Sequence, residues 1–156
     1  MSIIKSLLNV ETKVYFKPYA ISRIAIGLFF FITGANKMFN PVFQASMLKT
    51  ITGIGFPYPE FTAHFTAFNE CFFGLLLALG LFTRIGALVL NIVLFVALFT
   101  YDIHYHIPKN LDVFTWYSYF LYLPQVLYIL FLFQVLWCGS GPYSIDSYLW
   151  NKRKNS

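Results

Sequence analysis

The sequence predicts an all-α membrane protein: an antiparallel bundle of four transmembrane helices with an interfacial helix or loop between the first two. Of its 156 residues, 58% are hydrophobic and 11% are charged, whereas about a quarter of the residues in a soluble domain are charged. A spanning helix needs about 20 mostly apolar residues, and four runs have about this length. They lie at residues 19–39, 61–81, 83–102 and 113–138. We therefore expect residues 1–156 to form one transmembrane domain in a lipid bilayer.

The distribution of charge predicts a topology rather than a nucleic-acid partner. The formal charge is +5, but the lysines and arginines are scattered over helix ends and tails instead of lining one face. Eight of the eleven fall on the side of the two termini. By the positive-inside rule, both termini are expected in the cytoplasm.

The first spanning helix is expected at residues 19–39, after an amphipathic segment at residues 1–18 that would lie on the membrane surface. Successive helical residues are about 100° apart, so one narrow stripe holds Arg23, Gly27, Phe30, Gly34 and Lys37. The two glycines predict a close helix contact. In the loop at residues 40–59, Pro41 can begin a short helix that the run GIGFPYP ends. We interpret the loop as an interfacial cap, which either gates a cavity or, as is more usual, simply connects two helices.

The second spanning helix, residues 61–81, carries Glu70 near its middle. An ionisable group at that depth is costly, so it usually faces a bundle interior or cavity and has a partner. A short turn at residues 80–84 makes the second and third helices antiparallel neighbours.

The third helix, residues 83–102, has Arg84, Asn91, Leu98 and Asp102 on one face, so Asn91 is expected to be a buried hydrogen-bonding residue. Pro124 predicts a kink in the fourth helix, residues 113–138, that neighbouring helices compensate. The tail from Gly139 is expected to leave the membrane.

Polar residues of three helices reach a common level. Lys37 lies 14 residues after Arg23, Glu70 lies 14 before Arg84, and Gln125 lies 13 before Cys138. At 1.5 Å per residue, each is about 20 Å above the cytoplasmic end of its helix. Four further residues are expected slightly higher, near the outer boundary: His64, Asp102, His104 and Tyr122.

Three hypotheses explain this layer. Lys37 and Glu70 form an ion pair that only fixes helix packing, or they bind the polar head of a small hydrophobic ligand such as a quinone, or Glu70 belongs to a proton or solute path. In the second case Lys37 donates to a carbonyl, Glu70 exchanges protons, and Tyr122 and Gln125 help to hold the ring. The residues alone slightly favour the first hypothesis.

The histidines are weak candidates for a metal site. His104 and His106 have a spacing that can ligate a metal from an extended turn, and His64 lies at a similar height. No HExxH motif or paired-cysteine framework accompanies them, so no bound metal is expected. Cys71 and Cys138 lie at different depths, which argues against a disulfide.

Several motifs together resemble the DoxX family of small four-helix bacterial membrane proteins. They are RIAIGLFFFITGANK, GIGFP, NECFFGLLLALGLFTRIGAL and GSGPYSID, and they cover about residues 22–146. The resemblance implies a protein of the bacterial cytoplasmic (inner) membrane, linked to respiratory or sulfur redox chemistry. Some members are described as quinone-reducing oxidoreductase subunits or as membrane parts of detoxification complexes. The family's recurring polar positions correspond to Arg23, Lys37, Glu70 and Arg84.

We therefore expect a DoxX-like subunit of a redox assembly that binds a quinone or similar ligand. It is at most a quinone-linked oxidoreductase subunit, because the sequence has no cofactor motif and no redox cysteine pair, so a partner subunit must supply electrons. The alternatives are a non-catalytic accessory or scaffold subunit and a small proton or solute pathway. The expected ligand residues are Lys37, Glu70, Tyr122 and Gln125; the expected structural polar residues are Arg23, Arg84, Asn91 and Asp102.

Overall fold

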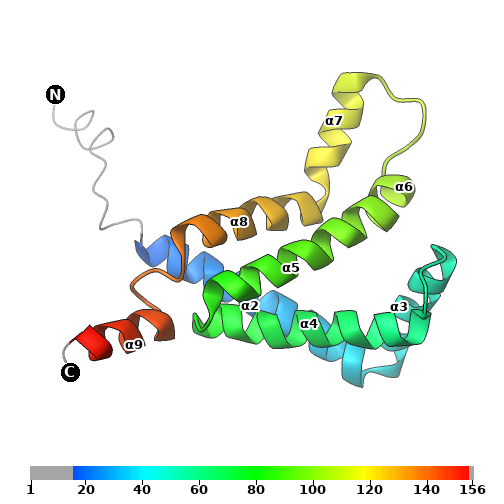
Figure 1. Cartoon of the computed structure of the whole chain (residues 1–156). Helices are drawn as coiled ribbons and strands as arrows, with labels where there is room; N and C mark the ends of the chain where they lie inside the picture. Colours follow the sequence, from blue (N-terminus) through cyan, green and yellow to red (C-terminus); the bar gives the residue numbers. More distant parts are fainter. Residues whose placement is uncertain (1–15, 155–156) are drawn as a thin grey trace, which may run out of the picture.

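A computed structural model describes residues 16–154, and these residues form helices and connecting turns (Figure 1). Most of the amphipathic segment expected at residues 1–18 lies outside this range. The helices are α2 (Phe16–Phe39), α3 (Pro41–Gly53), α4 (Pro59–Leu79), α5 (Thr83–Ala97), η1 (Leu98–Asp102), α6 (Ile103–His106), α7 (Val113–Tyr122), α8 (Pro124–Cys138) and α9 (Ile145–Lys154). Within the described range, the all-α prediction is confirmed.

Three of the helical segments are long and apolar enough to cross a membrane. They are Lys17–Phe39, Pro59–Leu79 and the continuous stretch Thr83–His106. The pair Val113–Tyr122 and Pro124–Cys138 also qualifies as one segment, although the two helices are bent by 67° at the break between them. The chain is therefore an integral, multi-pass membrane protein with three or four spans.

Glycines bring α2 and α4 into direct backbone contact. A Cβ atom added to Gly27 would overlap the backbone of Ala78, and one added to Gly34 would overlap that of Cys71. From the other helix, a Cβ on Gly74 would overlap the backbone of Phe31. The packing role predicted for the two glycines of α2 is confirmed, and this close approach sets the distance between the polar side chains on the same faces.

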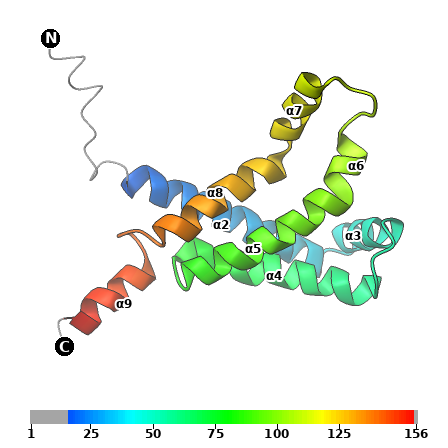
Figure 2. The same ribbon diagram turned by 45° about the horizontal axis from the view of Figure 1, so that its top comes forward.

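The hydrophobic core lies mainly between α4, α5 and α8. Leu77, Leu90, Leu132 and Val135 are fully buried there. Gly80 ends α4 in the left-handed conformation, and only three residues separate α4 from α5. Figures 1 and 2 show α4 and α5 side by side and running in opposite directions, as the short turn predicts.

The helix expected at residues 113–138 is divided into α7 and α8. Leu123 is extended, with φ −66° and ψ 124°, because the ring of Pro124 disfavours a helical conformation in the residue before it. The break lies where the sequence predicts a kink. Neighbouring helices do not enclose the first half, since no residue of α7 is buried.

Two short helices flank the long ones at opposite ends of the molecule. The side chain of Asn40 caps α3 by accepting a hydrogen bond from Val42 N, and Pro41 occupies the first turn. Figures 1 and 2 show α3 across one end of α2 and α4, whereas α9 lies at the other end, near the start of α2. The expected interfacial segment between the first two spans is thus a helix.

Candidate functional site

Lys37 and Glu70 meet where α2 and α4 cross closely. Lys37 is in the last turn of α2, and Glu70 lies on the face of α4 that Gly34 allows α2 to approach. The Lys37 Nζ atom donates hydrogen bonds to Glu70 Oε1 at 2.9 Å and to Oε2 at 2.6 Å. The structure brings together the two charged residues that the depth count placed at one level.

The pair lies at the border between the packed helices and an open space. The side chain of Glu70 is 9% exposed, while that of Lys37 is 30% exposed. A lysine ammonium has three donors, and two of them are directed at Glu70. The ion pair is therefore sheltered on one side and available to a further polar group on the other.

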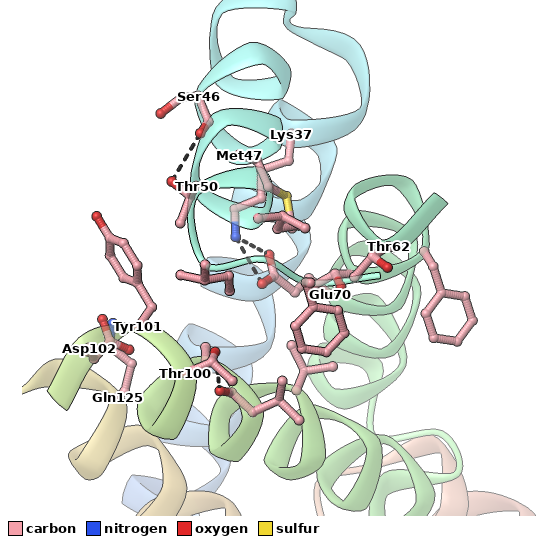
Figure 3. A pocket seen from close by; sticks show the side chains of 18 of the residues that line it. Lys37, Ser46, Met47, Thr50, Thr62, Glu70, Thr100, Tyr101, Asp102 and Gln125 are labelled. Atoms are coloured by element: carbon pink, nitrogen blue, oxygen red, sulfur yellow. Dashed lines mark hydrogen bonds and ion pairs between the residues drawn. The ribbon is translucent and has the colours of Figure 1, made fainter. Parts of the chain in front are cut away.

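A cavity of about 550 Å³ adjoins this pair (Figure 3). Small-molecule sites generally have volumes of about 300–1,000 Å³ and are largely apolar with a few polar groups. Apolar side chains from α3, α4 and α5 form most of the wall, including Met47, Ile51, Phe65, Ile92 and Val96. Its size and its lining suit a small, mostly hydrophobic molecule.

A second polar group forms another part of the cavity wall. Asp102, His106 and Gln125 line it from η1, α6 and α8. Asp102 Oδ1 lies 3.2 Å from His106 Nδ1. The Asp102 side chain is 4% exposed and that of His106 is 52% exposed, so this pair extends from the cavity wall to the molecular surface.

Two oxygen atoms in this second group have no hydrogen-bond partner among the described residues: Asp102 Oδ2 and Gln125 Oε1. Most buried polar atoms in proteins have a partner, and the surrounding side chains shield both of these atoms from solvent. Asn91 is also buried without a side-chain partner in the described part of the chain, but it is not among the residues that line the cavity. Its burial agrees with the prediction, but the hydrogen bond predicted for it is not found among the described residues.

The position of Asp102 depends on a π-helical turn. The continuous span Thr83–His106 changes from α to π geometry at Leu98–Asp102. Such single turns are rare and often occur at functional sites. Thr100, Tyr101 and Asp102 all line the cavity. The sequence analysis named Asp102 only as a structural polar residue and singled out neither Thr100 nor Tyr101.

Other residues singled out from the sequence lie away from the cavity. Tyr122 is 87% exposed on α7 and does not line it, because the bend before Pro124 carries α7 outward. His64 is exposed and pairs with Gln44 Nε2 at 3.2 Å, and His104 is exposed on α6. In residues 16–154, no three residues that commonly ligate metals come together.

Arg23 forms a separate polar cluster at the opposite end of α2. It is 1% exposed, and its guanidinium donates to Leu77 O at 2.5 Å, Ala78 O at 3.2 Å and Tyr143 O at 2.8 Å. Its Nε atom has no partner among the described residues. Arg23 thus joins three segments of the chain.

The segment after α8 lies at the same end of the molecule as Arg23 and contacts the start of α5. Asp146 accepts hydrogen bonds from Phe82 N at 2.9 Å, Thr83 N at 3.1 Å and Thr83 Oγ1 at 2.9 Å, so it caps the start of α5. Tyr19 donates its hydroxyl hydrogen to Gly139 O. The exposed Arg84 only reaches Trp137 O at 3.4 Å. The motif GSGPYSID therefore folds back onto the turn between α4 and α5.

In a comparison with protein families, a family model described as DoxX matches residues 19–103. This range is more than half of the chain and includes Lys37, Glu70 and Asp102, while α7, α8 and α9 lie outside it. Neither the curated proteins nor the solved structures contain a match.

Proposed function

The chain belongs to the DoxX family, and from this premise we propose that it is a membrane subunit of a redox assembly that binds a quinone or similar hydrophobic ligand. The supporting observation is the bidentate Lys37–Glu70 pair in the wall of a largely apolar cavity of about 550 Å³. The apolar walls favour a lipid-soluble ring, and the pair supplies a donor and an acceptor for its oxygen atoms.

Lys37 and Glu70 have complementary roles in this proposal. The third N–H of the Lys37 ammonium donates to a ligand oxygen, and Glu70 accepts a hydrogen bond or exchanges a proton with it. Both cysteines are free, and they do not form a redox pair. We propose that electrons are exchanged with a partner subunit rather than supplied by the residues of this chain.

The proposed setting is the bacterial inner membrane, with α7 and α8 together as a fourth crossing of an antiparallel bundle. Arg23 and Arg84 lie at the end of the molecule that also holds α9 (Figure 2). By the positive-inside rule, we propose that this end of the molecule, with both termini, faces the cytoplasm. The cavity then opens towards the outer leaflet.

The test measures binding of a short-chain benzoquinone to the purified full chain in mild detergent. We expect Lys37→Met and Glu70→Gln each to weaken binding at least about tenfold, since each removes a charged hydrogen-bonding group. The matched controls are Lys49→Met and Glu60→Gln, which change exposed residues that do not line the cavity. Unchanged binding in both site variants, with normal folding, would contradict the proposal.

A second candidate function, a scaffold subunit, is supported by α7. None of its residues is buried, and Phe114 and Tyr122 are 88% and 87% exposed. An aromatic surface of this kind suits contact with another membrane protein. This function predicts a stoichiometric partner whose co-purification is lost in Phe114→Ser but retained in Lys37→Met. Co-purification that is equally strong in both variants would argue against α7 as the docking surface.

A further inference from the structure

The cavity lies where α4 and α5 move apart. Near their short turn the two helices are packed together, and a Cβ atom on Gly86 would lie 3.4 Å from the backbone oxygen of Phe73. Figures 1 and 2 show the helices diverging from that turn. Farther along, both helices contribute to the cavity wall. The space between α4 and α5 is therefore closed at the turn and widens towards the Lys37–Glu70 pair.

Three apolar residues of the cavity wall also lie on the surface of the molecule. Ile92 and Val96 of α5 are 56% and 43% exposed, and Phe65 of α4 is 55% exposed. A residue that lines a cavity and is also exposed borders an opening of that cavity. The cavity therefore opens between α4 and α5, and the border of this opening is apolar.

The depth of Ile92 places the opening inside the membrane. Ile92 lies eight residues after Arg84 in the span Thr83–His106, or about 12 Å from the start of that span at 1.5 Å per residue. The hydrocarbon core of a bilayer is about 30 Å thick, so Ile92 lies near its middle. The same count places the Lys37–Glu70 pair about 20 Å from that end. The cavity thus extends from the polar pair towards the middle of the bilayer.

We propose that the ligand carries a long alkyl tail and enters the cavity sideways from the bilayer, between α4 and α5. Its polar ring lies at the Lys37–Glu70 pair, and its tail passes Ile92 and Val96 into the lipid. The inference rests on the proposed function and adds the class of ligand, which is a quinone-type ring with an apolar tail.

The polarity of the wall changes along this path as it does along such a ligand. At one end, Lys37 Nζ and the Glu70 carboxylate supply a donor and an acceptor for the ring. At the opening, the side chains of Phe65, Ile92 and Val96 consist of hydrocarbon alone. The tail moves between lipid and an apolar wall and is never transferred to water, so binding does not require removal of the ligand from the membrane.

Binding of two benzoquinones that differ only in their alkyl group, ethyl or decyl, to the purified protein in mild detergent tests the proposal. Ile92→Trp obstructs the opening with a larger side chain. It should weaken binding of the decyl compound about tenfold and leave binding of the ethyl compound within about twofold. Val96→Phe narrows the same border, should act in the same direction, and serves as a second probe if Ile92→Trp folds poorly. Each variant is compared with the original protein for one compound at a time, so partition into detergent cancels.

The matched control is Leu88→Trp. Leu88 lies one turn before Ile92 on α5, is 50% exposed and does not line the cavity. The same substitution at this position should leave binding of both compounds within about twofold of the original. A loss of decyl binding as large as that in Ile92→Trp would overturn the proposed path, because it would show that any bulky residue on this face has the effect.

Two further results would overturn the path. One is binding of the decyl compound by Ile92→Trp and Val96→Phe that is as tight as in the original protein. The other is equal weakening of both compounds in these variants, since the ethyl compound has no long tail to obstruct. In either case, weaker binding of both compounds by Lys37→Met leaves the proposed function standing. If neither compound binds the original protein, the proposed function and the path fall together.

Discussion

The helix pair α2 and α4 has a cation of α2 at each end, and the two cations differ in what they contact. Arg23 donates to three backbone carbonyl oxygens and is 1% exposed. Lys37 donates to a single carboxylate, and its side chain is 30% exposed beside a cavity. The Arg23 end is closed by the chain itself, whereas the Lys37 end leaves hydrogen-bonding capacity for another molecule.

The difference shows how to separate a structural charge from a binding charge in one fold. Backbone carbonyls do not titrate, so the hydrogen bonds of Arg23 do not depend on the protonation of its partners. A carboxylate beside a cavity can accept a proton or a ligand hydrogen bond. The burial of a charged residue alone does not distinguish the two roles; the chemistry of its partners and the adjoining space do.

Removing the charge of Arg23 should have the largest effect on stability. Arg23→Met loses the hydrogen bonds of a buried, charged group to Leu77, Ala78 and Tyr143, so we expect a loss of at least about 3 kcal/mol. Thermal unfolding in mild detergent measures it. Ligand affinity of the folded fraction should stay within about twofold of the original. Unfolding at the original temperature would show that this end does not hold the chain together.

Separating α2 from α4 should affect both stability and the Lys37 end. Gly34→Val places side-chain atoms where the backbone of Cys71 lies, so the helices must move apart at a cost of about 1–3 kcal/mol. We expect ligand binding to weaken together with unfolding temperature. Gly53→Val is the control, because a Cβ at Gly53 meets no atom within 4 Å. Equal effects of the two substitutions would contradict the close-contact explanation.

A double-mutant cycle sharpens the comparison at the Lys37 end. Lys37→Met alone leaves a nearly buried carboxylate without its cation, while Lys37→Met with Glu70→Gln removes both charges. We therefore expect the double variant to be more stable than the sum of the single effects predicts, by about 1–2 kcal/mol. The free energy of unfolding of all four proteins gives this coupling. Additive effects would mean that the two charges do not interact in the folded protein.

The smallest expected effect concerns the carboxyl of Asp112, which lies outside the helix pair α2 and α4. Hydrogen bonds from the side chain and backbone of Thr115 hold the pKa of Asp112, the N-cap of α7, below its ordinary value. Because this pKa is lowered by folding, the charged cap stabilises the folded state above the ordinary pKa of aspartate, near 4, and this contribution disappears as pH falls through the lowered value. Asp112→Asn, an uncharged cap, should therefore differ most from the original protein near neutral pH. Unfolding measured at several pH values checks the sign, and a difference that grows towards acid would refute it.

The sequence by itself determined the membrane environment, the helical class and the meeting of Lys37 with Glu70. Apolar composition and run length are properties of single segments, so they need no tertiary information. The spacing of Gly27, Gly34 and Lys37 also follows from one helix, and helical rise relates the depth of Lys37 to that of Glu70. Regular helices therefore made this part of the candidate site predictable, although its ligand remains a proposal.

Only the tertiary structure decided that Asp102 joins that site and that Tyr122 does not. The π turn at Leu98–Asp102 places Asp102 on the cavity wall, and the 67° bend before Pro124 takes Tyr122 away from it. Arg23 meets Tyr143 across 120 positions of the chain. Such contacts depend on local departures from the regular helix and on packing between distant segments, and the energies of both are set by neighbours that a local sequence pattern does not contain.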